Sequence, residues 1–284
     1  MTDSLPGNTD LQHDDRDWST LSPGDRIRQI ELEGYLIVPD LLDAEHLGRL
    51  KDQAASWETT PRDYSPHQRG RGDIQWEGGA ATDLIAHPPT MQLLRQALGE
   101  RVLVLSYIYD RSEPGTPGIS LHTDGQPYGS QIFGMNGSCP ATIRVLYYLD
   151  DLTLDVSPFR VVPRSHLSLH ADANPYARYE THPEEVIVTC RAGSALFLNH
   201  RVFHGTRPNT GQRERSMLAI AYRPAWAGPI GPVPEWDAER VSHLPETVQP
   251  LFADPNTREW DFEGTNKPAG MKKTAPGMGP ARWQ

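Results

Sequence analysis

The clearest pattern along the chain is a series of short apolar segments between about residues 101 and 222. These segments are rich in Val, Leu and Tyr or alternate between apolar and polar positions, and clusters of Gly, Pro, Asn and Asp separate them. A period of two is typical of strands with one buried face. Many short strands joined by turn signals indicate a sandwich, a barrel or a jelly roll. We therefore expect strands over residues 101–109, 142–149, 159–162, 185–189, 195–198 and 216–222.

The first hundred residues show a different pattern, with helix signals on both sides of one short strand. Ser22, Pro23 and Asp25 suit the start of a helix, because Ser and Asp cap helices and Pro fits the first turn. Residues 34–39, Gly-Tyr-Leu-Ile-Val-Pro, predict a buried strand. A second helix is expected to begin at Asp43, and a third to cover residues 89–98 and end at Gly99. The prediction for the whole chain is a mainly β fold with flanking helices.

The two ends of the chain lack this periodicity. Residues 1–22 are polar and rich in Asp, Asn, Ser, Gly and Pro, which predicts a disordered N-terminal tail. Residues 263–284 are rich in Gly and Pro and predict a C-terminal tail. Only one cluster of strands lies between them and no repeat is present, so we expect a single domain over residues 23–262.

Composition and charge argue against several classes of protein. The 284 residues include 27 basic and 37 acidic side chains, a net charge of -10, whereas a nucleic-acid-binding protein usually presents a basic face. No segment approaches the roughly 18 apolar residues of a membrane helix, and the acidic N-terminus does not resemble a signal peptide. Cys139 and Cys190 are expected to be reduced thiols, since two cysteines make neither a disulfide framework nor a structural zinc site. We expect a cytoplasmic protein, monomeric or homodimeric, without nucleic-acid or membrane partners.

Metal-binding chemistry is indicated by His122 and Asp124, which follow the short apolar segment at residues 118–121. Residues i and i+2 of an extended segment point to the same side, so one metal can accept both. The best third ligand is His204. Two imidazoles and one carboxylate form the facial triad of non-heme Fe(II) oxygenases, although zinc hydrolases use similar ligands. His200 is the alternative, but the Gly205-Thr206 context of His204 and its separation from a basic residue farther along the chain favour His204.

That basic residue is Arg215, which opens the expected strand at residues 216–222, eleven positions after His204. An arginine fork binds a carboxylate through two hydrogen bonds. 2-Oxoglutarate chelates iron through its keto-acid end, and its far carboxylate needs such a partner. Thr206 is expected to donate its hydroxyl to the same carboxylate. Arg207 and Arg213 are alternatives, but they lie in a polar turn and are expected to be exposed.

Taken in order, these motifs resemble the phytanoyl-CoA dioxygenase family of iron(II)- and 2-oxoglutarate-dependent oxygenases. The resemblance covers about residues 25–225 and rests on the segment at 34–39, the His-x-Asp motif, Arg-Val-Val-Pro-Arg-Ser-His at 160–166, His-Gly-Thr-Arg-Pro-Asn at 204–209, and Arg215. It implies a double-stranded β-helix, a cupin-like jelly roll, with the metal between its sheets. It also implies a contact between Tyr107 and 2-oxoglutarate, although a core position for Tyr107 is an open alternative. Asp124 favours hydroxylation, because halogenating relatives lack this carboxylate.

The resulting prediction is an enzyme that uses Fe(II), 2-oxoglutarate and O2 to hydroxylate a small metabolite or natural-product intermediate, releasing succinate and CO2. Desaturation, epoxidation or rearrangement on the same scaffold are alternatives, as is a binding protein that keeps the fold without turnover. Gln126 and Tyr128 directly follow the metal motif and are expected to line the substrate pocket. Arg144 lies mid-strand among apolar residues, so it is expected either to bind an acidic substrate group or to pair with an internal carboxylate.

Overall fold

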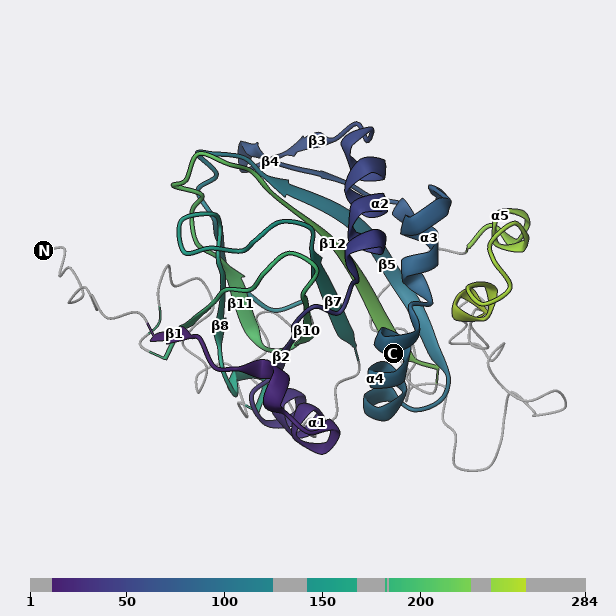
Figure 1. Ribbon diagram of the computed structural model, residues 1–284, viewed down its shortest axis with the longest axis horizontal. Coiled ribbons are helices and arrows are strands. Elements are labelled where there is room, and N and C mark those ends of the chain that lie inside the picture. Colours follow the sequence, from purple (N-terminus) through teal and green to yellow (C-terminus); the bar gives the residue numbers. More distant parts are fainter. Residues whose placement is uncertain (1–11, 125–141, 168–181, 183, 226–235, 254–284) are drawn as a thin grey trace, which may run out of the picture.

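Two β-sheets that face one another form the body of the protein, and helices cover the outer side of the larger sheet (Figure 1). The computed structural model describes residues 12–124, 142–167, 182, 184–225 and 236–253. The larger sheet contains, in spatial order, β2 (Tyr35–Val38), β10 (Ala195–Asn199), β7 (Ile143–Tyr148), β12 (Arg215–Pro224), β5 (Val102–Ser112), β4 (Ser65–Arg71) and β3 (Thr60–Arg62). The smaller sheet contains β1 (Gln12–Asp14), β9 (Val186–Val188), β8 (Phe159–Val162), β11 (Phe203–Thr206) and β6 (Ile119–His122).

The strands have the jelly-roll arrangement that the sequence predicts. The chain crosses from one sheet to the other between β7 and β8, between β9 and β10, between β10 and β11, and between β11 and β12. All strand pairs are antiparallel except β1 with β9. All six predicted strands between residues 101 and 222 are present, as is the predicted strand at residues 34–39. The prediction of a mainly β, cupin-like fold is therefore confirmed.

Side-chain caps mark the starts of the first two helices. The described helices are α1 (Pro23–Leu32), α2 (Ala44–Ala55), α3 (Gly79–Ile85), α4 (Pro88–Leu98) and α5 (Ala238–Ser242), with short 3-10 turns η1 (Trp18–Thr20), η2 (Ile74–Trp76), η3 (Ser165–Leu167) and η5 (Gln249–Phe252). The hydroxyl of Ser22 accepts the backbone N–H of Asp25 at 3.2 Å, and the carboxylate of Asp43 accepts that of His46 at 2.7 Å. These contacts satisfy N–H groups that the first helical turn leaves unpaired, which explains why α1 and α2 begin where they do.

Strand register divides the central strands into two faces. Directly opposed residues of an antiparallel pair share a face, and successive residues alternate between faces. The inner face, which looks toward the smaller sheet, carries Arg144, Leu146 and Tyr148 of β7, Arg215, Met217, Ala219 and Ala221 of β12, and Asp110 and Ser112 of β5. The outer face carries Ile143, Val145 and Tyr147 of β7, Ser216, Leu218 and Ile220 of β12, and Tyr107 and Tyr109 of β5.

Helices α3 and α4 anchor the outer face through tyrosine hydroxyls. Tyr147 donates to the hydroxyl of Thr90 in α4 at 2.9 Å, and Tyr222 donates to the carbonyl of Ile85 at the end of α3, also at 2.9 Å. The apolar core is one large cluster that runs from Trp18 to Phe252. Within the described part of the chain, no helix combines the length and apolar character needed to cross a membrane.

The prediction of a disordered tail over residues 1–22 is wrong from residue 12 onward. Residues Gln12–Asp14 pair with β9, and Tyr35 donates its hydroxyl to Asp14 at 2.7 Å. Trp18 is buried and lies edge-on against the ring of Tyr35. These contacts join residues far apart in the sequence, so a polar composition does not reveal them. Residues 1–11 and the predicted C-terminal tail lie outside the described residues.

Candidate metal centre

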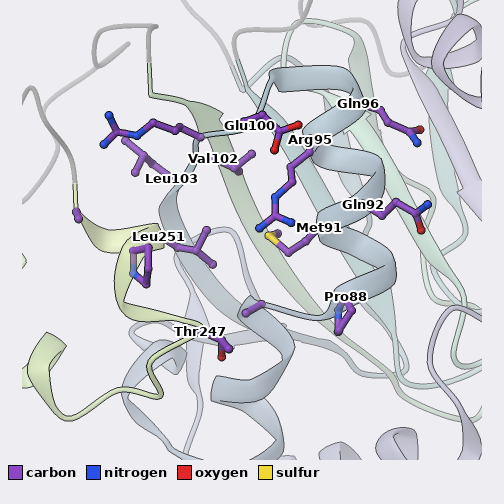
Figure 2. Close-up of a pocket in the computed structure, with 14 residues that line it drawn as sticks. Pro88, Met91, Gln92, Arg95, Gln96, Glu100, Val102, Leu103, Thr247 and Leu251 are labelled. Carbon is purple, nitrogen blue, oxygen red and sulfur yellow. The ribbon is translucent and has the colours of Figure 1, made fainter.

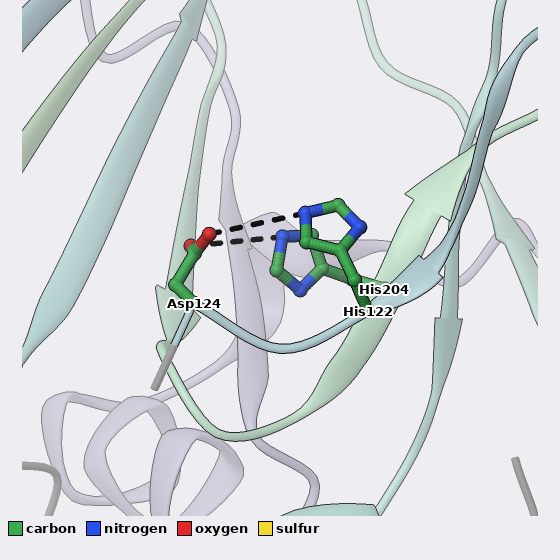
Figure 3. Close-up of side chains that lie close together, drawn as sticks. All are labelled: His122, Asp124 and His204. Carbon is green, nitrogen blue, oxygen red and sulfur yellow. Dashed lines mark ion pairs between the residues drawn. The ribbon is translucent and has the colours of Figure 1, made fainter. Parts of the chain in front are cut away.

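Three side chains with metal-binding atoms meet at the ends of β6 and β11 (Figure 3). His122 is the last residue of β6, and its Cα is paired with that of His204 in β11. Asp124 follows two residues after β6. The Nε2 atom of His122 lies 3.8 Å from Oδ1 of Asp124, and that of His204 lies 3.7 Å from Oδ2. One ligand atom from each residue lies within 4.8 Å of the others, so the three predicted ligands converge on one point.

Backbone carbonyls orient both imidazoles toward this point. Nδ1 of His122 lies 2.8 Å from the carbonyl oxygen of Ser120, and Nδ1 of His204 lies 2.9 Å from that of Val202. A carbonyl only accepts, so each Nδ1 carries the proton and each Nε2 presents a lone pair. Burial, with a smaller contribution from His122, lowers the pKa of His204 to about 3. His204 is therefore neutral near pH 7, which is the form that binds a metal.

Asp124 supplies the negative charge of this group. Its backbone N–H donates to the carbonyl of His200 at 2.7 Å, and the Nε atom of Arg144 lies 3.1 Å from its Oδ2. Burial favours the protonated acid, but the charge of Arg144, helped by the nearby histidines, holds the pKa of Asp124 below its usual value. The carboxylate is therefore ionised near pH 7, where His204 is neutral.

The separation of the two imidazoles depends on close backbone contact at Gly205. A Cβ atom at this position would overlap the carbonyl oxygen of Ile119 and lie 2.9 Å from that of Ser120. Glycine therefore allows β11 to approach β6 more closely than any other residue could. His204 and Thr206, on either side of Gly205, project toward the same side of β11.

The structure separates His204 from its rival His200. His200 lies in the turn between β10 and β11, and its Nδ1 atom lies 3.0 Å from the carbonyl of Thr142. It is buried and is not a member of the three-residue group. Strand alternation alone does not separate the two histidines, because it does not show that a turn lies between β10 and β11.

Arg215 is fully buried at the start of β12, and none of its three guanidinium nitrogens has a hydrogen-bond partner among the described residues. Its nearest aromatic neighbour is Tyr148, whose ring centroid lies 5.8 Å from the guanidinium carbon. A buried cation without a partner is costly, so this position suits an anionic ligand. The two alternatives have partners: Arg207 forms an ion pair with Glu185 at 2.8 Å, and Arg213 donates to Thr153 at 2.8 Å.

Register and contacts connect Arg215 with the metal-binding group. Arg215 shares the inner face of the larger sheet with Arg144, which reaches Asp124. Its cross-strand partner is Ser112, whose hydroxyl lies 2.5 Å from that of Ser157, just before β8. Farther along β8, the ring of Phe159 stacks on His204 at 5.8 Å. The unpartnered guanidinium and the three side chains therefore belong to the same space between the sheets.

Thr206 lies beside a cavity of about 780 Å³ that also reaches His122. The Thr206 hydroxyl accepts the backbone N–H of Ile119 at 3.1 Å, so its own proton is free to be donated elsewhere. Tyr64 and Arg160 line the same cavity, and neither was selected from the sequence. No local signal marks them, because the β3–β4 hairpin and the pairing of β8 with β11 bring them there.

The structure contradicts the predicted contact between Tyr107 and 2-oxoglutarate. Tyr107 pairs with Ile220, which places it on the outer face, away from Arg215 and Arg144. It is buried beside Tyr147 and Tyr222, and burial raises its pKa well above the ordinary value. Tyr107 is thus a core aromatic, the alternative that the sequence left open. Its hydroxyl has no partner among the described residues.

The predicted substrate residues have different outcomes. Arg144 pairs with Asp124, which is the internal carboxylate that the sequence allowed as an alternative to a substrate group. Gln126 and Tyr128 lie outside the described residues. Cys190, the one cysteine that the structure describes, is a free thiol whose pKa burial raises to about 12, in agreement with the prediction; Cys139 is not described.

A second cavity, of about 850 Å³, lies on the helix-covered side of the larger sheet (Figure 2). Helix α4, the start of β5 and the η5 turn line it, with side chains that include Met91, Arg95 and Leu251. None of the three metal-binding side chains contributes to it. The cavity beside His122 is therefore the one relevant to chemistry.

Comparison with known proteins agrees with this geometry. A similar curated protein is dioxygenase af480 of Aspergillus fumigatus, which is 22% identical over 178 residues, covering 61% of this chain and 53% of that protein. The chain thus matches only about half the length of this relative. A crystal structure of HygX from Streptomyces hygroscopicus with nickel, 2-oxoglutarate and hygromycin B bound superposes with a TM-score of 0.60 at 17% identity, covering 71% of this chain and 87% of that one.

Another similar structure is the non-heme α-ketoglutarate-dependent epimerase SnoN from nogalamycin biosynthesis, with a TM-score of 0.61 at 20% identity over 79% of this chain and 88% of that one. At these identities the solved structures establish the fold. The family itself follows from the sequence model of phytanoyl-CoA dioxygenase (PhyH), which matches residues 30–217. This span contains the three metal-binding side chains and Arg215, and the protein belongs to the phytanoyl-CoA dioxygenase family.

Proposed function

We propose that this protein is an iron(II)- and 2-oxoglutarate-dependent dioxygenase that oxidises a small organic substrate, with hydroxylation of a C–H bond as its reaction. The observation that carries the proposal is the combination of two features in one space between the sheets. One is the group formed by His122, Asp124 and His204, and the other is the buried, unpartnered guanidinium of Arg215. A zinc hydrolase would have use for the first feature but not for the second.

The residues fit both groups. Two neutral imidazoles with Nε2 lone pairs and one carboxylate match the donor set of a facial Fe(II) site, which leaves the opposite coordination positions open. Arg215 presents a planar, permanently charged fork that suits the far carboxylate of 2-oxoglutarate. When bound, iron(II) and 2-oxoglutarate supply the activation of O2, with one oxygen atom entering succinate as CO2 leaves and the other entering the substrate.

The protein's own side chains would then perform three tasks. The three ligands hold the metal at a fixed point between two rigid sheets. Arg215 and the Thr206 hydroxyl hold the co-substrate by its far end, so that its keto-acid end reaches the metal. The cavity beside His122, lined also by Tyr64 and Arg160, holds the substrate next to the metal. Positioning of this kind is the main contribution of a protein whose cofactor does the oxidation.

The relatives support the class of reaction and leave its final outcome to experiment. The curated relative is called a dioxygenase, HygX binds 2-oxoglutarate, and SnoN is an α-ketoglutarate-dependent epimerase. The intact carboxylate at Asp124 leaves no ligand position for chloride, so we propose oxygen insertion rather than halogenation. Products of desaturation, epoxidation, epimerisation or ring closure differ from an alcohol in mass, connectivity or configuration, so product analysis by mass spectrometry and NMR distinguishes them.

The direct test is a spectroscopic titration of metal-free protein under anaerobic conditions. Addition of Fe(II) and then 2-oxoglutarate should produce a weak absorption band in the green, which reports keto-acid chelation to iron. Zn(II) in place of Fe(II) should give no band. With O2 and the correct substrate, each oxidised molecule should accompany one succinate. Turnover with Zn(II) and without 2-oxoglutarate would contradict the proposal.

A further inference from the structure

Arg144 has an unusual position for an arginine, in the middle of β7 at the centre of the larger sheet. Its backbone is paired on both sides, with Leu198 of β10 and Ala221 of β12. Its side chain is 28% exposed and extends from the inner face toward the smaller sheet, where it meets Asp124. A strand hydrogen-bonded on both edges is a rigid base, so the guanidinium is held in place much more firmly than a surface side chain.

The carboxylate of Asp124 has different neighbours at its two oxygens. Oδ2 lies 3.1 Å from Nε of Arg144 and 3.7 Å from Nε2 of His204, whereas Oδ1 lies 3.8 Å from Nε2 of His122. Each oxygen therefore lies beside one of the two imidazoles, and Oδ2 also contacts a permanent cation. This ion pair restrains the carboxylate at Oδ2.

Asp124 needs such a support, because the secondary structure around it has ended. β6 stops at His122, and the described backbone contact of Asp124 is the single hydrogen bond from its N–H to the carbonyl of His200. Without a side-chain partner, the carboxylate could rotate away from the two imidazoles. Partners of this kind around metal ligands typically affect metal affinity by about 10- to 100-fold.

We propose that Arg144 is a positioning residue that restrains the carboxylate of Asp124 beside the two imidazoles, where the three side chains would bind a metal together. This inference rests on the proposed metal site. Arg144 would thus support metal binding without contributing a ligand atom.

The chain offers a matched control in Arg111 of β5. Its side chain is 29% exposed, close to the value for Arg144, and it pairs with Glu113 at 2.8 Å. Like Arg144 it lies inside a strand of the larger sheet, but it pairs with Ser216 and so lies on the outer face. Replacement of either arginine by methionine removes a charge of similar exposure, and only one of the two changes affects Asp124.

The test measures binding of Ni(II) and Co(II) by calorimetry, together with the visible spectrum of the Co(II) protein. Arg144→Met should weaken Ni(II) binding by about 10- to 100-fold and change the intensity of the Co(II) bands, which depends on coordination number. Arg144→Lys should recover part of the loss, and Arg111→Met should stay within about twofold of wild type. Thermal unfolding of each variant shows whether it has folded.

Two outcomes would overturn the inference: Ni(II) binding by folded Arg144→Met as tight as in wild type or tighter, or the same loss in Arg111→Met. If Arg144→Met does not fold, Arg144→Lys decides, because unchanged affinity and an unchanged Co(II) spectrum in that variant also contradict the inference. Failure of the wild-type protein to bind Ni(II), Co(II) or Fe(II) at all would instead contradict the proposed function. The two failures are therefore distinguishable.

Discussion

The two faces of the larger sheet are formed by the same strands, but their buried polar groups differ in hydrogen bonding. On the outer face, the buried hydroxyls of Tyr147 and Tyr222 donate to Thr90 and Ile85 of the helices, whereas the hydroxyl of Tyr107 has no partner among the described residues. On the inner face, the guanidinium of Arg215 is charged, and its three nitrogens have no partner among the described residues. Arg215, Tyr147 and Tyr222 are all fully buried, so exposure to water does not account for the difference.

The difference shows which buried polar groups belong to the fold and which belong to ligand binding. A buried donor that stabilises the fold already has its acceptor, because leaving it unpaired would cost about 1–3 kcal/mol and more for a charge. A buried cation kept without an acceptor reduces the stability of the ligand-free protein. Such a cost is expected where a ligand supplies the missing partner.

Removal of a proposed metal ligand should have the largest effect. His204→Ala should weaken Ni(II) or Fe(II) binding by more than about 100-fold and should abolish turnover. This loss exceeds the roughly 10- to 100-fold loss that is typical when a residue that only supports a metal ligand is removed. His200→Ala, four residues away, should bind metal normally. Calorimetry with both variants measures the contrast. Loss of binding in His200→Ala with retention in His204→Ala would reverse the assignment.

Replacement of Arg215 should change stability and co-substrate binding in opposite directions. Arg215→Met should weaken 2-oxoglutarate binding by roughly 2–5 kcal/mol, which is about thirtyfold to several thousandfold. The same change should raise the free energy of unfolding of the ligand-free protein by about 1–4 kcal/mol, because an apolar side chain replaces an unpartnered buried cation. Urea unfolding and calorimetry provide the two measurements. Arg213→Met is the control, and unchanged 2-oxoglutarate binding in Arg215→Met would count against the proposed site.

The inner site should also make the metal-free protein sensitive to acid. Burial lowers the pKa of His204 to about 3 and that of His200 to about 4. Below about pH 6.5 the unfolded chain binds protons at these positions and the folded chain does not, so stability falls as pH falls. Each histidine should contribute a loss of about 2 kcal/mol between pH 6.5 and 5. In chelator-treated His200→Gln, the free energy of unfolding measured with urea should fall less over this pH range than in the wild-type protein. An equally large fall in both proteins would contradict the explanation.

On the outer face, loss of one hydroxyl should affect stability alone. Tyr147→Phe removes the hydrogen bond to Thr90, which keeps a second partner in His87 at 3.1 Å. The free energy of unfolding should fall by about 1 kcal/mol, while metal and 2-oxoglutarate binding should not change. A clear change in either binding constant would show that the two faces are more closely coupled than the strand register suggests.

The sequence predicts most of the strands because their alternation is local. Residues 159–162 are predicted and observed as the same strand, β8. β4, with the sequence Ser-Pro-His-Gln-Arg-Gly-Arg, was not predicted, since its residues have low strand propensity and the strand forms by pairing with β5. β1 likewise forms by pairing with a distant strand, β9, so its own residues do not predict it.

The site was predictable to the extent that its signals were local or followed the family pattern. His122 and Asp124 are two residues apart, and Arg215 opens a strand that alternation predicts. Which residues of that alternation face inward is not a local property, so the sequence leaves open whether Tyr107 contacts the cofactor or packs in the core. The ion pair between Arg144 and Asp124 joins segments of the two sheets. Only the folded structure therefore shows that Arg144 pairs with an internal carboxylate, one of the two alternatives that the sequence allowed.

The contact at Gly205 places the dimensions of the site under the control of the main chain. Because a Cβ atom there would overlap the carbonyl of Ile119, any larger residue must push β6 and β11 apart. The two histidines lie on those strands, so the spacing between them would widen although both side chains were intact. Substitution of Gly205 is therefore expected to change the geometry of the proposed metal-binding group, although this residue contributes no ligand atom.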